Sequence, residues 1–205
     1  MALRYEINLK PNVTFTLGMR CAKPDEVVYA AISSITQTAP AAIATVAPHG
    51  LISGWPVWVE SVKGMVEINN PRPSECGNND VCPPYIATVT GASSVLLNAV
   101  NSSGWGAYKG GGVLAWQKPR DITGYIALFV VSDKAGVELL SISSNVLSTE
   151  GSLTVDPATS TVALRVDTSA QALLTGVEMA YQIVLTDPAD DDKTYLLAEG
   201  PIKVK

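Results

Sequence analysis

Apolar and polar residues alternate from the start of the chain. The alternation runs over residues 3–9 and resumes over residues 13–17, after a turn signal at Pro11 and Asn12. A repeat of two residues is typical of a strand with one buried face, since successive side chains of a strand point to opposite faces of the sheet. Two such segments joined by a turn predict an opening β-hairpin.

Short apolar segments follow along the whole chain, each bounded by Gly, Pro, Asn or Ser. They predict strands at residues 27–35, 42–46, 57–62, 85–89, 94–100, 125–131, 138–142, 153–156, 161–166, 180–186 and 195–204. Residues 168–174 are rich in Ala and Leu and predict a turn or two of helix, capped by Thr168 or Ser169. Regular short strands favour β-sandwich or small-barrel domains over a doubly wound α/β enzyme, so the predicted fold class is all-β.

Composition constrains the surface and the partners. The 205 residues suffice for one large β domain or two small ones. Only 16% of the residues are charged and 47% are hydrophobic, a composition that suits a subunit packed against others. The net charge of −5 argues against a nucleic-acid partner, because binding to phosphates needs a basic surface.

The sequence predicts neither a membrane span nor encoded export. No apolar run is long enough to cross a bilayer, and the N-terminal residues lack the apolar core of a signal peptide. Three cysteines are too few for a disulfide scaffold, and together with a single histidine they argue against a zinc site. We therefore expect synthesis in the cytoplasm.

The chain carries no recognisable catalytic or cofactor-binding motif. Its single histidine, His49, lies in a segment typical of a strand-to-turn corner, which favours a structural role. The acidic residues at 187–192 lie between two predicted strands without the spacing of an EF-hand loop, so a solvated hairpin tip is favoured over a calcium site. We therefore expect no enzyme activity, no cofactor and no metal.

A stretch rich in proline and cysteine interrupts the strands at residues 70–84. Cys76 and Cys82 are spaced for a disulfide that closes a small loop, and two free thiols are the alternative. Pro-stiffened segments lose little entropy on docking, and Trp and Tyr contribute strongly to interfaces. The candidate contact residues are therefore Trp105 and Tyr108 together with Pro71, Pro73, Pro83 and Pro84.

The aromatic residues have two interpretations. Trp55, Trp58 and Trp105, with Tyr85 and Tyr108, could form an aromatic face that binds sugar. Residues three apart on a strand point to opposite sides, so Trp55 and Trp58 are not expected to share one platform. Packing in a core or a subunit interface is the favoured interpretation.

The C-terminal part of the chain carries a series of motifs over about 85 residues. They are Asp121-Ile-Thr-Gly-Tyr125, Ser132-Asp-Lys-Ala-Gly136, Gly151-Ser-Leu-Thr-Val155, Thr161-Val-Ala-Leu-Arg165, Thr168-Ser-Ala-Gln-Ala-Leu-Leu174, Ala180-Tyr-Gln-Ile-Val-Leu185 and Leu196-Leu-Ala-Glu-Gly-Pro-Ile-Lys-Val204. The series resembles the immunoglobulin-like domain of phage baseplate and tail proteins, in which an N-terminal hairpin with an aromatic segment precedes the first motif. Residues 5–17 are similar to that hairpin. The resemblance implies that residues 1–28 and 118–205 form one immunoglobulin-like β-sandwich, interrupted by an insertion.

The intervening residues 29–117 resemble a second module. The matching segments are Ile32-Ser-Ser-Ile-Thr-Gln37, Ala41-Ala-Ile-Ala-Thr45, His49-Gly-Leu51, Tyr85-Ile-Ala-Thr-Val89 and Ser102-Ser-Gly-Trp-Gly-Ala-Tyr108, and composition changes at Gly110–Gly112. They are similar to a small β module of phage virion proteins, which implies an inserted small β-barrel or sandwich. The stretch between Asn69 and Tyr85 departs from that module, where a short turn is usual.

Together these resemblances imply a structural protein of a bacteriophage virion, located in the virion and bound to other virion proteins and to copies of itself. A tail, collar or baseplate position is favoured, and capsid decoration, a capsid cement or a head fibre is the alternative. A second alternative is a tail-appendage module that binds glycans of the host surface. Several aromatic side chains exposed on one face would favour that module.

Overall fold

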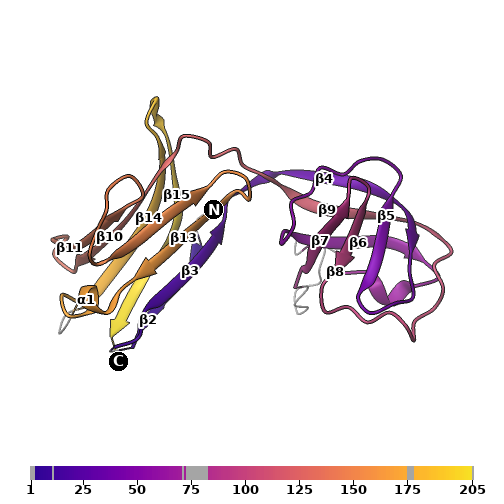
Figure 1. Ribbon diagram of the computed structural model, residues 1–205, viewed down its shortest axis with the longest axis horizontal. Coiled ribbons are helices and arrows are strands. Elements are labelled where there is room, and N and C mark those ends of the chain that lie inside the picture. The colour runs from indigo at the N-terminus through magenta and orange to yellow at the C-terminus, as the bar shows by residue number, and fades with distance from the viewer. Residues whose placement is uncertain (1–2, 11, 71, 73–82, 175–177, 205) are drawn as a thin grey trace. The chain divides into compact units, whose positions relative to one another are not determined.

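The computed structural model describes residues 3–10, 12–70, 72, 83–174 and 178–204 (Figure 1). Strands dominate these residues, which confirms the all-β class. The chain divides into two compact units. Unit 1 combines Met1–Ala22 with Pro119–Lys205, and unit 2, Lys23–Lys118, lies between these segments in the sequence.

The larger sheet of unit 1 has the strand order β1, β15, β14, β10, β11, and β2 also pairs with β15. Its strands are β1 (Leu3–Arg4), β2 (Ile7–Leu9), β10 (Ile126–Asp133), β11 (Glu138–Ser143), β14 (Met179–Asp187) and β15 (Asp190–Val204). The short strands β1 and β2 run parallel to β15, and the remaining neighbours are antiparallel. The start of the chain therefore forms one edge of this sheet.

The smaller sheet of unit 1 has the antiparallel order β12 (Gly151–Asp156), β13 (Thr161–Val166), β3 (Phe15–Arg20). Helix α1 (Thr168–Gln171) follows β13 and is shorter than the helix predicted over 168–174. Its N-cap is Asp167, so the predicted cap at Thr168 or Ser169 is wrong. The Ser169 hydroxyl instead donates to the Thr149 carbonyl at 2.9 Å and ties the helix to the preceding loop.

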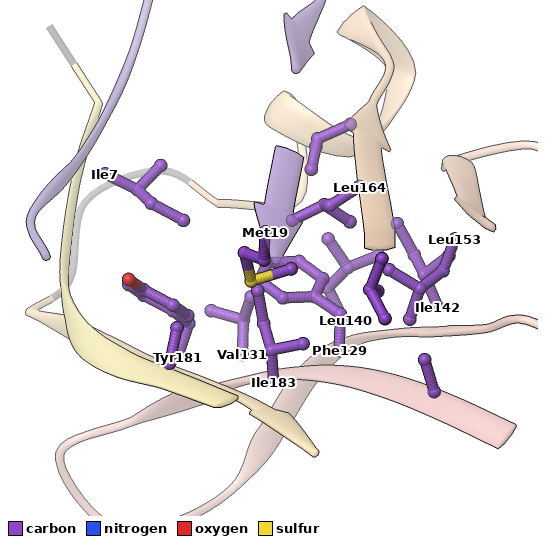
Figure 2. Close-up of a cluster of buried hydrophobic side chains, with 14 of the residues drawn as sticks. Ile7, Met19, Phe129, Val131, Leu140, Ile142, Leu153, Leu164, Tyr181 and Ile183 are labelled. Carbon is purple, nitrogen blue, oxygen red and sulfur yellow. The ribbon is translucent and has the colours of Figure 1, made fainter. Parts of the chain in front are cut away.

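One hydrophobic cluster joins the two sheets (Figure 2). The larger sheet contributes Phe129, Val131, Tyr181 and Ile183, and the smaller sheet contributes Met19, Leu153 and Leu164. All of these side chains are buried, and the rings of Phe129 and Tyr181 lie 6.0 Å apart. Burying a large apolar side chain contributes about 1.5–3 kcal/mol, so this shared core is the main stabilising feature of unit 1.

The predicted opening hairpin is wrong. β2 pairs with β15 of the larger sheet, whereas β3 pairs with β13 of the smaller sheet. Ile7 and Met19 nevertheless belong to the same buried cluster, as Figure 2 shows. Alternation shows that each segment has a buried face. Two such faces can belong to one sheet, or they can enclose a core from opposite sheets, as they do here.

Unit 2 forms a closed barrel in the strand order β4, β5, β8, β7, β6, β9. The strands are β4 (Ala22–Ile35), β5 (Ala41–Thr45), β6 (Pro56–Lys63), β7 (Tyr85–Gly91), β8 (Ser94–Leu97) and β9 (Gly110–Pro119), with a 3-10 turn η1 at Val66–Ile68. Alternate residues are buried along β5, where Ala41, Ile43 and Thr45 are inside, and along β8, where Val95 and Leu97 are inside. Small barrels are filled by such inward side chains, and this unit therefore has a core of its own.

A buried serine holds the two points where the chain leaves and re-enters unit 1. The Arg120 amide donates to the Cys21 carbonyl at 2.8 Å. The Ser160 hydroxyl lies 2.8 Å from the Cys21 carbonyl and 2.6 Å from that of Arg120, and donates to one of them at a time. The Arg120 guanidinium stacks on the Tyr195 ring, 3.8 Å from its centroid. Ala22 and Pro119 are thus held close together.

Candidate functional site

The outer face of the larger sheet carries an uncharged apolar surface. On β10 the side chains of Ala127, Phe129 and Val131 point into the core, so Leu128 and Val130 point outward. Leu128 lies opposite Val184 of β14, and Val184 lies opposite Leu196 of β15. We call Leu128, Val130, Val184 and Leu196 the apolar band.

The side chains of the apolar band are accessible to solvent in unit 1. Leu128 and Leu196 are 37% and 38% exposed, and Val130 and Val184 are partly exposed. Ser143 of β11 lies opposite Leu128 on its other side, so the row from β11 to β15 contains no charged side chain. A contiguous row without charge is typical of a contact surface, because charged residues are depleted at interface centres.

Two open grooves adjoin this face and share Ala180 and Pro201. The larger, of about 480 Å³, is lined by Arg4, Tyr5 and Glu199 among others. The smaller, of about 370 Å³, has a largely charged lining that includes Asp133, Lys134, Glu178 and Lys203. Tyr5 is 54% exposed, and its carbonyl accepts a hydrogen bond from the Tyr181 hydroxyl at 2.8 Å. Charged residues are depleted at interface centres, so these charged grooves border the apolar band and do not extend it.

The predicted contact residues Trp105 and Tyr108 are half-buried against their own unit. The Tyr108 hydroxyl lies 2.9 Å from the carbonyls of both Ile32 and Gly111, and the Gln37 side-chain amide donates to the Trp105 carbonyl at 2.6 Å. These bonds fix the segment on the barrel. They leave only part of each ring accessible to a partner.

The Cys- and Pro-rich stretch is only partly described. Pro83 and Pro84 are exposed, whereas Pro71, Pro73, Cys76 and Cys82 lie outside the described residues. Arg72 pairs with Glu60 of β6 at 2.9 Å and stacks over the Tyr29 ring of β4 at 5.2 Å. Both groups of the ion pair are largely buried, so Arg72 anchors this position of the stretch to the barrel wall.

The tryptophans considered for a sugar-binding face are mainly core residues. Trp55 and Trp58 are 1% and 7% exposed, and the Trp55 indole donates to the Gln117 carbonyl at 2.7 Å. Burial raises the pKa of Tyr85, whose hydroxyl points to the Ile68 carbonyl. Among the described residues, the exposed aromatics are Tyr5 of unit 1 and Tyr29 of unit 2. In the part of the chain that the structure describes, neither unit therefore has two fully exposed aromatic side chains.

The candidate polar groups have local structural roles. His49 is buried, and its Nδ1 accepts a hydrogen bond from the Leu51 amide at 2.9 Å, while its Nε2 has no partner among the described residues. Asp187 accepts from the Ala189 amide and Asp190 pairs with Lys193, as expected for the tip of the β14–β15 hairpin. Over the described part of the chain, no group of His, Cys, Asp and Glu is arranged to hold a metal ion.

No model of a known protein family matches this sequence, and no curated protein matches it. Over the described residues, no helix is long and apolar enough to cross a membrane.

The sequence indicates the apolar band through continuous apolar runs, which a two-residue repeat does not describe. Residues 126–131 are apolar at every position, as are residues 183–185, although each strand has only one face in the core of unit 1. A continuous apolar run indicates a strand covered on both faces. In unit 1 the second face is the apolar band.

Proposed function

We propose that this chain is a structural protein of a tailed-bacteriophage virion, joining larger components of the tail, collar or baseplate by protein–protein contacts. The observation that carries the proposal is the apolar band, an uncharged row across the outer face of a chain with few charges overall. A face of this kind supports stable association with another protein surface. A capsid-decorating protein also needs an uncharged apolar face for its contacts. The position of the protein in the particle therefore distinguishes the two alternatives.

We further propose that unit 1 is an immunoglobulin-like sandwich. In that fold the second, fifth and fourth strands share one sheet, and the third, sixth and seventh share the other. β3, β13 and β12 correspond in order and pairing to the first set, and β10, β14 and β15 to the second. β1 and β2 depart from the constant-type arrangement, because they pair with β15 rather than with β3. The motifs at 121–204 support the same assignment.

The experiment is to localise the protein in phage particles produced from the genome that encodes it. Quantitative mass spectrometry of purified particles should detect the chain at a fixed copy number, and labelled antibody should place it at the tail, collar or baseplate. Its absence from purified particles would contradict the proposal. Labelling on the head would replace the tail position with capsid decoration.

The contribution of the apolar band is tested by the double substitution Leu128→Asp and Leu196→Asp. Both side chains face outward, so unit 1 should stay folded. Particle occupancy should fall by roughly tenfold or more, because an unpaired buried charge costs more than about 1–3 kcal/mol. The matched control is Ser152→Asp with Thr154→Asp, at exposed outward positions of β12. Occupancy equal to wild type in the Leu128 and Leu196 variant would exclude the band as a contact.

A further inference from the structure

β3 is the outermost strand of the smaller sheet of unit 1. One of its edges pairs with β13 over Phe15–Arg20, in an unbroken antiparallel register. Within the described part of the chain, no strand pairs with its other edge. The neighbouring position is vacant because β1 and β2, which come before β3 in the chain, joined the larger sheet instead.

The hydrogen bonds show which backbone groups face this free edge. The Cys21 amide donates to the Ser160 carbonyl at 2.8 Å, so Cys21 faces Ser160 at the position that continues the β3–β13 register. In an antiparallel ladder hydrogen-bonded positions alternate along the strand. Residues 15, 17 and 19 therefore bond to β13, and the N–H and C=O groups of Thr16, Gly18 and Arg20 point to the free edge.

The core is incompletely covered along the same edge. Phe15 and Leu17 face inward but are only partly buried, whereas Met19 on the same strand is 4% exposed. One more strand beside β3 would extend the sheet over them. β3 also lacks the usual protection of an edge strand, since it has no proline, no bulge and a single charge, Arg20, at its end.

We infer that the free edge of β3 pairs antiparallel with β3 of a second copy of the chain, giving a continuous six-stranded sheet across a two-fold axis. A strand edge is automatically complementary to itself in this arrangement, since each N–H meets a C=O of the copy. The contact lies apart from the apolar band and does not depend on the virion proposal.

Charge and side-chain size favour a second copy as the occupant. Among the registers that keep the free groups of Thr16, Gly18 and Arg20 in phase, the two with the longest overlap of Phe15–Arg20 are centred on Leu17 and on Gly18. Arg20 then lies opposite Thr14 or Thr16 of the copy, never opposite another arginine. A Cβ at Gly18 would meet no atom within 4 Å, so the outer face is open at this position. Inside, Leu17 meets Leu17 or Met19 of the copy and the two cores become continuous.

Sedimentation analysis of the purified protein over a concentration series tests the inference. We expect a monomer–dimer equilibrium whose dissociation constant rises by roughly tenfold or more in Gly18→Pro, because two symmetry-related hydrogen bonds are lost. Proline is tolerated where an edge N–H faces solvent, so the β3–β13 ladder should survive. Gly18→Ala is the control at the same position, since it keeps the N–H, and should dimerise like wild type.

A second variant guards against misfolding of the proline substitution. Thr16→Lys with Gly18→Lys adds charges at two exposed outward positions, and in either register these lysines lie directly opposite each other. This double-lysine variant of β3 should be monomeric and folded. Ser152→Lys with Thr154→Lys adds the same charge to β12, at the other edge of the sheet, and should remain dimeric. A monomeric wild type, or a dimer that persists in folded Gly18→Pro or in the lysine variant of β3, overturns the inference.

Discussion

Cys21 occupies the core of unit 1 where the chain leaves that unit, and its thiol is free and buried. Burial raises the pKa of this thiol to about 11 from an ordinary value of 9.0, and the Arg120 charge opposes part of the rise. The buried site therefore favours the neutral thiol over the thiolate. Because the thiolate is the reactive form, Cys21 should resist alkylation in the folded protein and react once the chain is unfolded.

The same shift makes the stability of unit 1 depend on pH. A raised folded-state pKa contributes stability that is fully present below the unfolded value near 9 and is lost as pH rises towards 11. Two pKa units correspond to about 3 kcal/mol at most. Urea unfolding followed by circular dichroism should show this decline over pH 9–11 in wild type and a flatter profile in Cys21→Ala. Parallel profiles for the two proteins would show that Cys21 does not titrate across this range.

At the scale of elements, β9 shows how glycine shapes a barrel strand. Gly110 and Gly112 both have positive φ, +109° and +89°, within the segment that pairs with β6. A Cβ at Gly112 would lie 2.5 Å from the Val62 Cγ2 atom, whereas one at Gly110 meets no atom within 4 Å. Substitutions at the two positions therefore distinguish two contributions to stability. At Gly110 an added Cβ costs only backbone strain, whereas at Gly112 it also clashes with neighbouring atoms.

We expect Gly110→Ala to cost about 1–2 kcal/mol, from backbone strain alone. Gly112→Ala should cost about 1–3 kcal/mol more, because the barrel wall must also move. All four tryptophans lie in unit 2, so urea unfolding followed by tryptophan fluorescence reports on this barrel. Equal losses in the two variants would contradict the close approach of β9 to Val62.

Strand β9 also contains residues whose structure could not be predicted from the sequence. Alternation predicted most strands of both units, since a half-buried strand shows its two faces directly. The three glycines at 110–112 instead indicate a boundary, yet they belong to β9, where Gly110 pairs with Lys63 and Gly111 with Val62 of β6. Glycine adopts positive φ readily, so these three residues continue the strand where a composition change alone indicates an end.

The pairing of strands could not be predicted from the local sequence either. The alternation of residues 3–17 gave the correct buried faces but the wrong pairing, because the sheet that each segment joins depends on β13 and β15, more than a hundred residues away. The apolar band illustrates the same limit for the candidate site. An apolar run on β10 indicates two covered faces, but only the fold shows which face the core already covers.

At the scale of the whole molecule, the two units have separate cores. Every residue of the main buried cluster of unit 1 comes from Met1–Ala22 or Pro119–Lys205. The buried tryptophans, Trp55, Trp58 and Trp116, all belong to unit 2. A compact unit with its own core can fold by itself, so removing one unit should leave the other intact.

Replacing Lys23–Lys118 with a short Gly/Ser linker should therefore leave a folded unit 1. The linker can be short because the Arg120 amide donates to the Cys21 carbonyl at 2.8 Å, which holds the two cut ends together. The product contains no tryptophan, so its fold is checked by far-ultraviolet circular dichroism and by cooperative thermal unfolding. Ser160→Ala in the shortened protein removes the hydroxyl that lies against both chain crossings, and should lower its stability by about 1–3 kcal/mol. A shortened protein without cooperative unfolding would mean that unit 1 needs the barrel in order to fold, although its core contains none of the barrel's residues.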